Sequence, residues 1–340
     1  MNNSTVLHKT SDAVADESGN TRRLYGIVEF KQPLLCQTEA LGSVFQIRIG
    51  QAQGHFELPS LPIESGRPSD PLHEPLVPPA SAKTWKSGDR QMLWGRRFVN
   101  QYPGGLPEIS RALLQFDVLP DQVAEISTSV YEHFREWKTR LFDGFDLFGS
   151  RWIPTGARVH SSIQDDLDLF LWNKSGKPER PYPDGQISVC TPTTSSLLEV
   201  ALTQPQFRDA CKLASSNAAL PVPYQFQLAA YRAIRDEDYR KAVVETAVAT
   251  EITLTQTLEK RLSKEDVPAH LQTFKQYKTL GGRVKLAEKM GLALPEDIWA
   301  ALVEPRNAVA HLGHHSTEQE ALRAVLTSRS ILSCHLPPLA

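Results

Sequence analysis

Three residues near the C-terminus, Arg306, Asn307 and His311, have side chains that together could cleave RNA. The reference pKa of histidine is about 6.5, so His311 can accept or release a proton at neutral pH. Arg306 stays charged and presents a planar fork of donors that suits phosphate oxygens. Asn307 can hydrogen-bond the phosphate or hold the histidine in one tautomer. Cleavage of this kind needs a base for the 2′-hydroxyl, an acid for the leaving 5′-oxygen and positive charge for the phosphorane, but no metal.

The spacing of these residues sets a geometric problem. On an ideal helix Arg306 and His311 are separated by about 140°, because each residue advances about 100°. Pro305 precedes them, and proline is tolerated at the start of a helix but not in its interior. We therefore predict a kink or short break at Glu304, a new helical turn from Pro305, and an arginine side chain that curls toward the histidine.

The arrangement Arg-Asn-x-x-x-His lies before Gly313 and a last helix, and in this position it resembles the signature of the HEPN superfamily. The resemblance covers residues 222–334 and includes Ala247-x-x-x-Glu251, which is similar to a stretch frequent in such domains. The layout of the chain most resembles the ApeA-like branch, which is linked to anti-phage defence.

The resemblance implies metal-independent RNA cleavage without a cofactor. The products would be a 2′,3′-cyclic phosphate and a 5′-hydroxyl. It also implies a homodimer through the C-terminal helices, in which two motifs face each other and two histidines supply both acid and base.

Two carboxylates are candidate supporting residues. Glu251 could orient Arg306 across the bundle, and Glu304 could pair with Arg306 or tune His311. The alternatives are a solvent-facing glutamate and a surface carboxylate at a helix end. For Arg306 and His311 themselves the alternative is a structural arginine at a kink and a capping or core histidine.

Lys285 and His314 are candidate RNA contacts. Lys285 belongs to a local basic stretch opposed only by Glu288. Its members are Lys275, Lys278, Arg283, Lys285 and Lys289. A solvated helix face and exposed loop histidines, His315 included, are the competing interpretations.

The sequence of the N-terminal part predicts an α+β domain over residues 23–217, which follows a flexible polar tail over residues 1–22. Apolar and β-branched residues predict strands at 24–30, 44–49, 112–118 and 167–172, with another candidate at 187–190. Helical periodicity predicts helices at 121–148 and 205–214. Between the strands, prolines predict a long loop over 57–80. We find no phosphate-binding glycine loop and no hydrolase or zinc motif in this domain.

After a boundary at 218–223, the sequence predicts an all-α, HEPN-like helical bundle over residues 222–335. Helices are expected at 224–235, 238–262, 269–280 and 283–290, and another opens at Leu294-Pro295-Glu296-Asp297. Thr317-Glu318-Gln319-Glu320 predicts a capping box at the start of the last helix.

Composition limits the class of protein. The chain of 340 residues is 41% hydrophobic and 22% charged, with a net charge of −2. Residues 221–340 carry 15 Lys and Arg against 14 Asp and Glu, a net charge of +1, so nucleic-acid contacts would be local. No apolar run is long enough for a membrane span and no secretory signal is visible, so we expect a cytoplasmic protein. The four cysteines lie too far apart in sequence to indicate a disulfide framework or a zinc site.

Three functions agree with the sequence. The first is a homodimeric endoribonuclease, a toxin or defence effector whose N-terminal domain senses a trigger or selects substrate, with or without an antitoxin partner. The second is a non-catalytic HEPN-like module that binds RNA or nucleotide, or serves assembly. In the third, the N-terminal domain is the functional part and the helices provide dimerisation.

Overall fold

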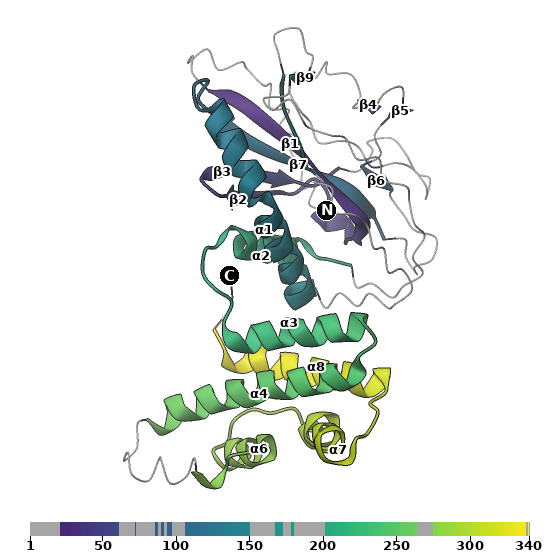
Figure 1. Ribbon diagram of the computed structural model, residues 1–340, viewed down its shortest axis with the longest axis vertical. Helices are drawn as coiled ribbons and strands as arrows, with labels where there is room; N and C mark the ends of the chain where they lie inside the picture. Colours follow the sequence, from purple (N-terminus) through teal and green to yellow (C-terminus); the bar gives the residue numbers. More distant parts are fainter. Residues whose placement is uncertain are drawn as a thin grey trace, which may run out of the picture.

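The N-terminal half folds into an antiparallel sheet, and the C-terminal part is mostly helical (Figure 1). This arrangement comes from a computed structural model. It describes residues 21–60, 72, 86–87, 90–91, 94–96, 106–149, 167–172, 178–179, 201–263, 275–337 and 339.

Antiparallel pairing joins consecutive strands as well as strands that are distant in sequence. In spatial order the strands are β2 (Val44–Ile49), β3 (Ala52–Glu57), β7 (Glu108–Val118), β1 (Arg22–Leu35), β8 (Leu167–Trp172) and β9 (Pro178–Glu179). Beside this path β6 (Gly95–Arg96) pairs with β7, and β4 (Lys86–Ser87) pairs with β5 (Arg90–Gln91) in a separate ladder. The long β1–β7 pair forms the centre of the sheet.

Two helices cover one face of this sheet, α1 (Val123–Gly149) and α2 (Gln204–Ser215) (Figure 1). The alternating strand residues that point toward them are buried, among them Phe45, Phe56 and Phe116. Phe45 stacks on Phe207 of α2 with ring centroids 6.0 Å apart, and Phe56 packs against Trp137 of α1 at the same distance. The core of the N-terminal domain therefore lies between the sheet and these two helices.

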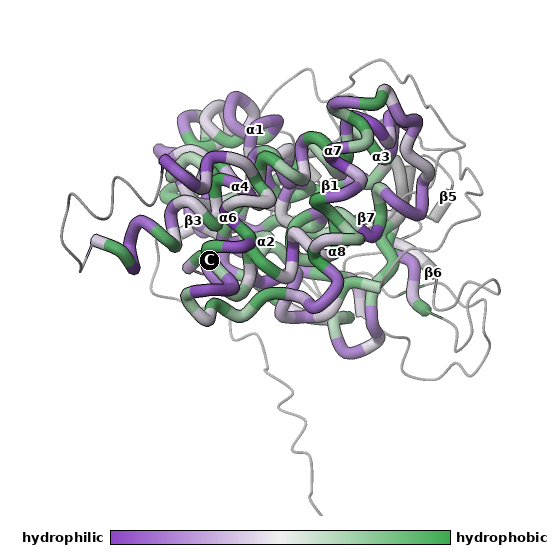
Figure 2. The backbone as a smooth tube through the Cα atoms, turned by 90° about the horizontal axis from the view of Figure 1, so that it is seen from below, coloured by the Kyte–Doolittle hydropathy of each residue, from purple (hydrophilic) through white to green (hydrophobic). Residues whose placement is uncertain are grey.

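The helical part stacks its helices in layers below the sheet (Figure 1). Its elements are α3 (Val222–Arg235), α4 (Tyr239–Leu262), α6 (Leu280–Lys289), the π-helical turn η2 (Trp299–Val303), α7 (Glu304–Leu312) and α8 (Glu318–His335). Seen from below, hydrophilic and hydrophobic residues alternate along these helices (Figure 2). The apolar faces of all six elements meet in a second core.

The end of α1 joins the two cores. Leu147 of α1 belongs to the core of the helical part. One turn of α1 also carries two carboxylates that pair with α3: Asp143 lies 2.7 Å from Arg232, and Asp146 lies 2.8 Å from Arg235. The side chain of Asp146 is only 5% exposed, so Arg235 compensates a carboxylate that is almost fully buried.

Most elements agree with the sequence patterns. Strands 44–49 and 167–172 are found at those bounds, and α1, α2 and α4 differ from expectation by at most two residues at either end. β1 begins at Arg22, the last residue of the expected tail, and β3 ends at Glu57, the first residue of the expected proline-rich loop. The expected strand at 187–190 lies outside the described residues, and so does the first half of the expected helix at 269–280. In its second half only Lys275 and Gln276 are helical before α6 begins at Leu280.

A substitution at the contact between α1 and α2 tests how closely these helices must approach. A Cβ at Gly144 would lie 2.7 Å from Cα of Ala210, which is backbone and cannot move independently. We expect Gly144→Ala to lower the free energy of unfolding by about 1–3 kcal/mol through overpacking, although alanine favours helix. Chemical denaturation measures the effect. Gly281→Ala is the matched control, because its Cβ would meet only side-chain atoms at 3.3 Å; equal losses at both sites would contradict the prediction.

The pH dependence of stability tests the burial of Glu57. Burial raises the pKa of its carboxyl to about 7, against the lowering effect of the hydrogen bond from Gln115. A pKa raised in the folded state contributes stability that is present below the unfolded pKa of about 4.3 and is lost as the pH rises to about 7. Glu57→Gln should therefore be more stable than wild type at about pH 8. Its free energy of unfolding should also change less with pH than that of wild type above about pH 5. Urea unfolding at both pH values measures this, and the exposed Glu136→Gln should leave the wild-type profile unchanged.

Candidate functional site

The helix that carries the motif begins without a break. Val303 and Glu304 both have right-handed helical dihedrals, and the Glu304 N–H donates to the carbonyl of Trp299, five residues back. The predicted break at Glu304 is therefore wrong, because the chain stays helical through this residue. The irregularity lies one turn earlier, in η2, and the chain remains helical through Pro305.

A π-helical turn solves the problem that proline creates. Pro305 has no N–H, and in an α-helix its ring would press on the carbonyl four residues back. The wider turn of η2 places one more residue before Pro305 and changes which carbonyl lies opposite its ring. Pro305 itself is buried against the bundle. The turn therefore fixes where the following residues point.

Within α7, the exposed motif residues form one stripe. Asn307 and His311 are separated by four residues and Glu304 precedes Asn307 by three, so all three lie along the same face of the helix. Each is exposed. Arg306 lies to the side and is half-buried.

Arg306 reaches this stripe through Asn307. Its Nη1 donates to Oδ1 of Asn307 over 3.1 Å, so the arginine curls toward the asparagine rather than the histidine. Among the described residues His311 makes no hydrogen bond or ion pair. The structure thus brings Arg306 and Asn307 together and leaves His311 free on the shared face.

Glu251 faces a different arginine from the one expected. It lies on α4, and its charge acts on Arg283 of α6 together with that of Glu259. Burial lowers the pKa of the Arg283 guanidinium, and the two glutamates oppose that shift. Within the described parts of the chain no hydrogen bond or ion pair joins Glu251 to Arg306, or Glu304 to either motif residue.

Lys285 lies beside the π turn. Its Nζ is 5.6 Å from the ring centroid of Trp299, a cation–π distance, and the Trp299 indole N–H donates to Glu288 over 3.0 Å. Trp299 is the first residue of η2, so this contact docks α6 against the element that leads into α7. The exposed charge of Lys285 is therefore held beside the π turn that leads into α7, which residue spacing alone did not reveal.

His314 is held by the cap of the last helix. Gly313 ends α7 in the left-handed conformation, with a φ of 64°. Nε2 of His314 then lies 3.3 Å from both carboxylate oxygens of Glu320. Glu320 closes the predicted capping box with Thr317, and the hydrogen bond from the Thr317 backbone is the main cause that lowers the Glu320 pKa.

The site is a surface rather than a pocket in one chain. Asn307 and His311 are open to solvent, and the neighbouring Leu312 is 82% exposed. Among the described residues, no group of three His, Cys, Asp or Glu side chains is placed to hold a metal ion. None of the described helices is both long and apolar enough to cross a membrane.

No protein-family model matches the chain, and no curated protein or solved structure matches it either. The case for a function therefore rests on the residues and on their geometry.

The capping box offers a test of what positions the loop before α8. The Thr317 hydroxyl accepts from the Glu320 backbone N–H, and the Glu320 carboxylate accepts from the Thr317 N–H over 2.7 Å. Thr317→Ala should lower the free energy of unfolding by about 1 kcal/mol, since an N-cap side chain is lost. Thr257→Ala is the control: its hydroxyl donates to the Thr253 carbonyl within a helix and caps nothing. A cap variant as stable as the control would contradict this role.

Proposed function

We propose that this chain is a metal-independent endoribonuclease that acts as a homodimer through its C-terminal helices. The observation that carries the proposal is the exposed stripe on α7. It combines a histidine and an asparagine on one face with an arginine bonded to that asparagine. These are the groups that proton transfer and phosphate binding require.

The contact between Arg306 and Asn307 supports a specific division of roles. A guanidinium can only donate, so the Asn307 oxygen must face it and the amide N–H groups must point elsewhere. Asn307 then presents two donors beside the remaining donors of Arg306. Together they form a neutral-plus-cationic pair suited to phosphate oxygens, while His311 on the same face exchanges the proton.

Because the stripe is exposed, a second copy of the chain could form the opposite wall of the active site. One histidine cannot act as base and acid in the same step, and an open surface does not exclude water. A two-fold axis near α7 would bring a second stripe opposite the first, because a C2 interface places the same patch on both subunits. The exposed Leu312 beside His311 would be buried by such a contact.

The supporting residues act at different distances. Glu304 lies seven residues from His311, about 10 Å along the helix, so it could tune only the histidine of the second copy. The charge of Glu251 acts on Arg283 of α6. Lys285 and His314 are the proposed RNA contacts outside the stripe.

By the resemblance to ApeA-like proteins, we assign the chain to cytoplasmic defence or toxin activity, with the α+β domain as the sensor.

The alternative is a non-catalytic HEPN-like module that binds RNA or nucleotide or serves dimerisation. One observation favours it: within the described residues nothing orients the His311 imidazole. In that case RNA binding would depend on Arg306 and no cleavage would occur.

Substitution of the stripe distinguishes these functions. His311→Ala and Arg306→Ala should each reduce RNA cleavage by about 10²-fold or more, because each removes a group that acts in the transition state. The assay follows a labelled RNA, with and without EDTA, and analyses the ends of the products. Light scattering then checks that each variant still dimerises.

The matched controls are His55→Ala and Arg323→Ala. His55 is exposed on β3, and Arg323 is exposed on α8 and paired with Asp297. Both should cleave like wild type. The proposal fails if the wild-type dimer leaves RNA intact. It also fails if cleavage persists in both motif variants. RNA binding that Arg306→Ala abolishes, without turnover in wild type, would instead establish the alternative.

A further inference from the structure

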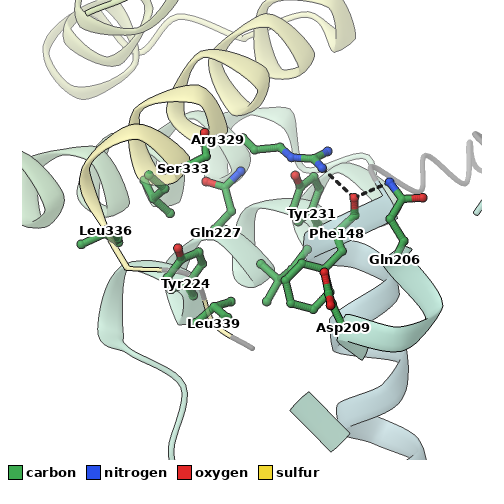
Figure 3. A pocket seen from close by; sticks show the side chains of 12 residues that line it. Phe148, Gln206, Asp209, Tyr224, Gln227, Tyr231, Arg329, Ser333, Leu336 and Leu339 are labelled. Carbon is green, nitrogen blue, oxygen red and sulfur yellow. Dashed lines mark hydrogen bonds between the residues drawn. The ribbon is translucent and has the colours of Figure 1, made fainter. Parts of the chain in front are cut away.

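A cavity of about 380 Å³ lies where the two domains meet (Figure 3). Its walls come from four helices: α1 contributes Phe148, α2 contributes Asp209, α3 contributes Tyr224, and α8 contributes Arg329. Leu339, beyond the end of α8, also lines it. This volume is within the range of small-molecule sites, which often lie at domain interfaces.

Two amide side chains in the wall are already satisfied by the protein. The Phe148 carbonyl accepts from Gln206 over 2.8 Å and from Arg329 over 2.7 Å, which completes the end of α1. Gln227 donates to the Val325 carbonyl and accepts from a serine hydroxyl of α8. These amides shape the cavity and have little capacity left for a ligand.

Three other polar groups retain capacity. Arg329 uses one of its five N–H donors on Phe148. The Tyr224 hydroxyl forms no hydrogen bond within the described residues. Asp209 accepts from Arg208 through Oδ1, which leaves Oδ2 available. The cavity thus offers one cation and one anion, together with the Tyr224 hydroxyl, in a mostly apolar wall.

The balance of charge selects the ligand. A phosphate dianion would meet a single guanidinium and would be repelled by the Asp209 carboxylate. A carboxylate carries one negative charge and fits the guanidinium fork with two parallel hydrogen bonds. The rings of Phe148 and Tyr224, with the leucines, provide contacts for a flat aromatic body.

We propose that this cavity is a binding site for a small aromatic carboxylate, roughly of the size of an indole ring with a short acid side chain. The carboxylate pairs with Arg329, the ring packs against Phe148 and Tyr224, and an amino group, where present, is directed to Asp209. The ligand contacts helices of both domains, so its binding stabilises their junction. This site does not depend on the proposed ribonuclease activity.

Calorimetric titration of the full-length protein tests the site, with indole-3-acetate as the probe. We expect binding of one molecule per chain and a higher melting temperature in its presence. Indole, which lacks the carboxylate, and adenosine 5′-monophosphate, which carries a phosphate, should each bind about tenfold more weakly or worse.

Two variants and one control make the outcome specific. Arg329→Gln should weaken indole-3-acetate binding by at least about tenfold, since a charge-assisted pair is lost. Because Arg329 also holds the end of α1, Tyr224→Leu provides a second test that leaves this hydrogen bond in place. It should weaken binding a few-fold, since one aromatic wall of the cavity is lost. Arg323→Gln, on the same helix but outside the cavity wall, should bind like wild type. The proposal is overturned if wild type binds no indole-3-acetate at millimolar concentration. Equal affinity of wild type and Arg329→Gln, or tighter binding of the phosphate probe, would also overturn it.

Discussion

The last two turns of α1 connect the sheet domain to the helical bundle. There the helix meets α2 at Gly144, pairs with α3 through Asp143 and Asp146, and receives Arg329 of α8 at the Phe148 carbonyl. A carboxylate near a helix C-terminus opposes the helix dipole, so Asp146 is unfavourable there without its arginine. The two ion pairs therefore favour the orientation of the sheet domain on the bundle in which these charges are satisfied.

The same turns explain why the two domains are less separate than their sequences indicate. The change in composition near residue 220 coincides with the start of α3 at Val222. The sequence contains no sign that Leu147 and Leu213, from the first domain, complete the core of the second. Such contacts depend on tertiary packing, which local periodicity does not encode.

Strands with β-branched or aromatic residues were predictable and those without them were not. β2 and β8 alternate or run apolar, and they appear where expected. β3 reads Ala-Gln-Gly-His-Phe-Glu and escaped prediction, because glycine and polar residues have low strand propensity. Its position is set by its neighbours: a Cβ on Gly54 would lie 2.2 Å from the Gln115 carbonyl oxygen, so glycine allows the strands to pair this closely. In the motif, proline revealed that the helix must be irregular, but only the structure places the irregularity before Glu304.

The π turn before α7 also determines which side of the bundle the motif faces. A π turn accommodates one residue more than an α turn, and one residue corresponds to a rotation of about 100° about the helix axis. If the same segment were wound as an ordinary α-helix, the face that now carries Asn307 and His311 would rotate by roughly a quarter of a circle. The width of a single turn thus sets the rotation of α7 about its axis. The orientation of the motif depends on the number of residues in η2 as much as on their identity.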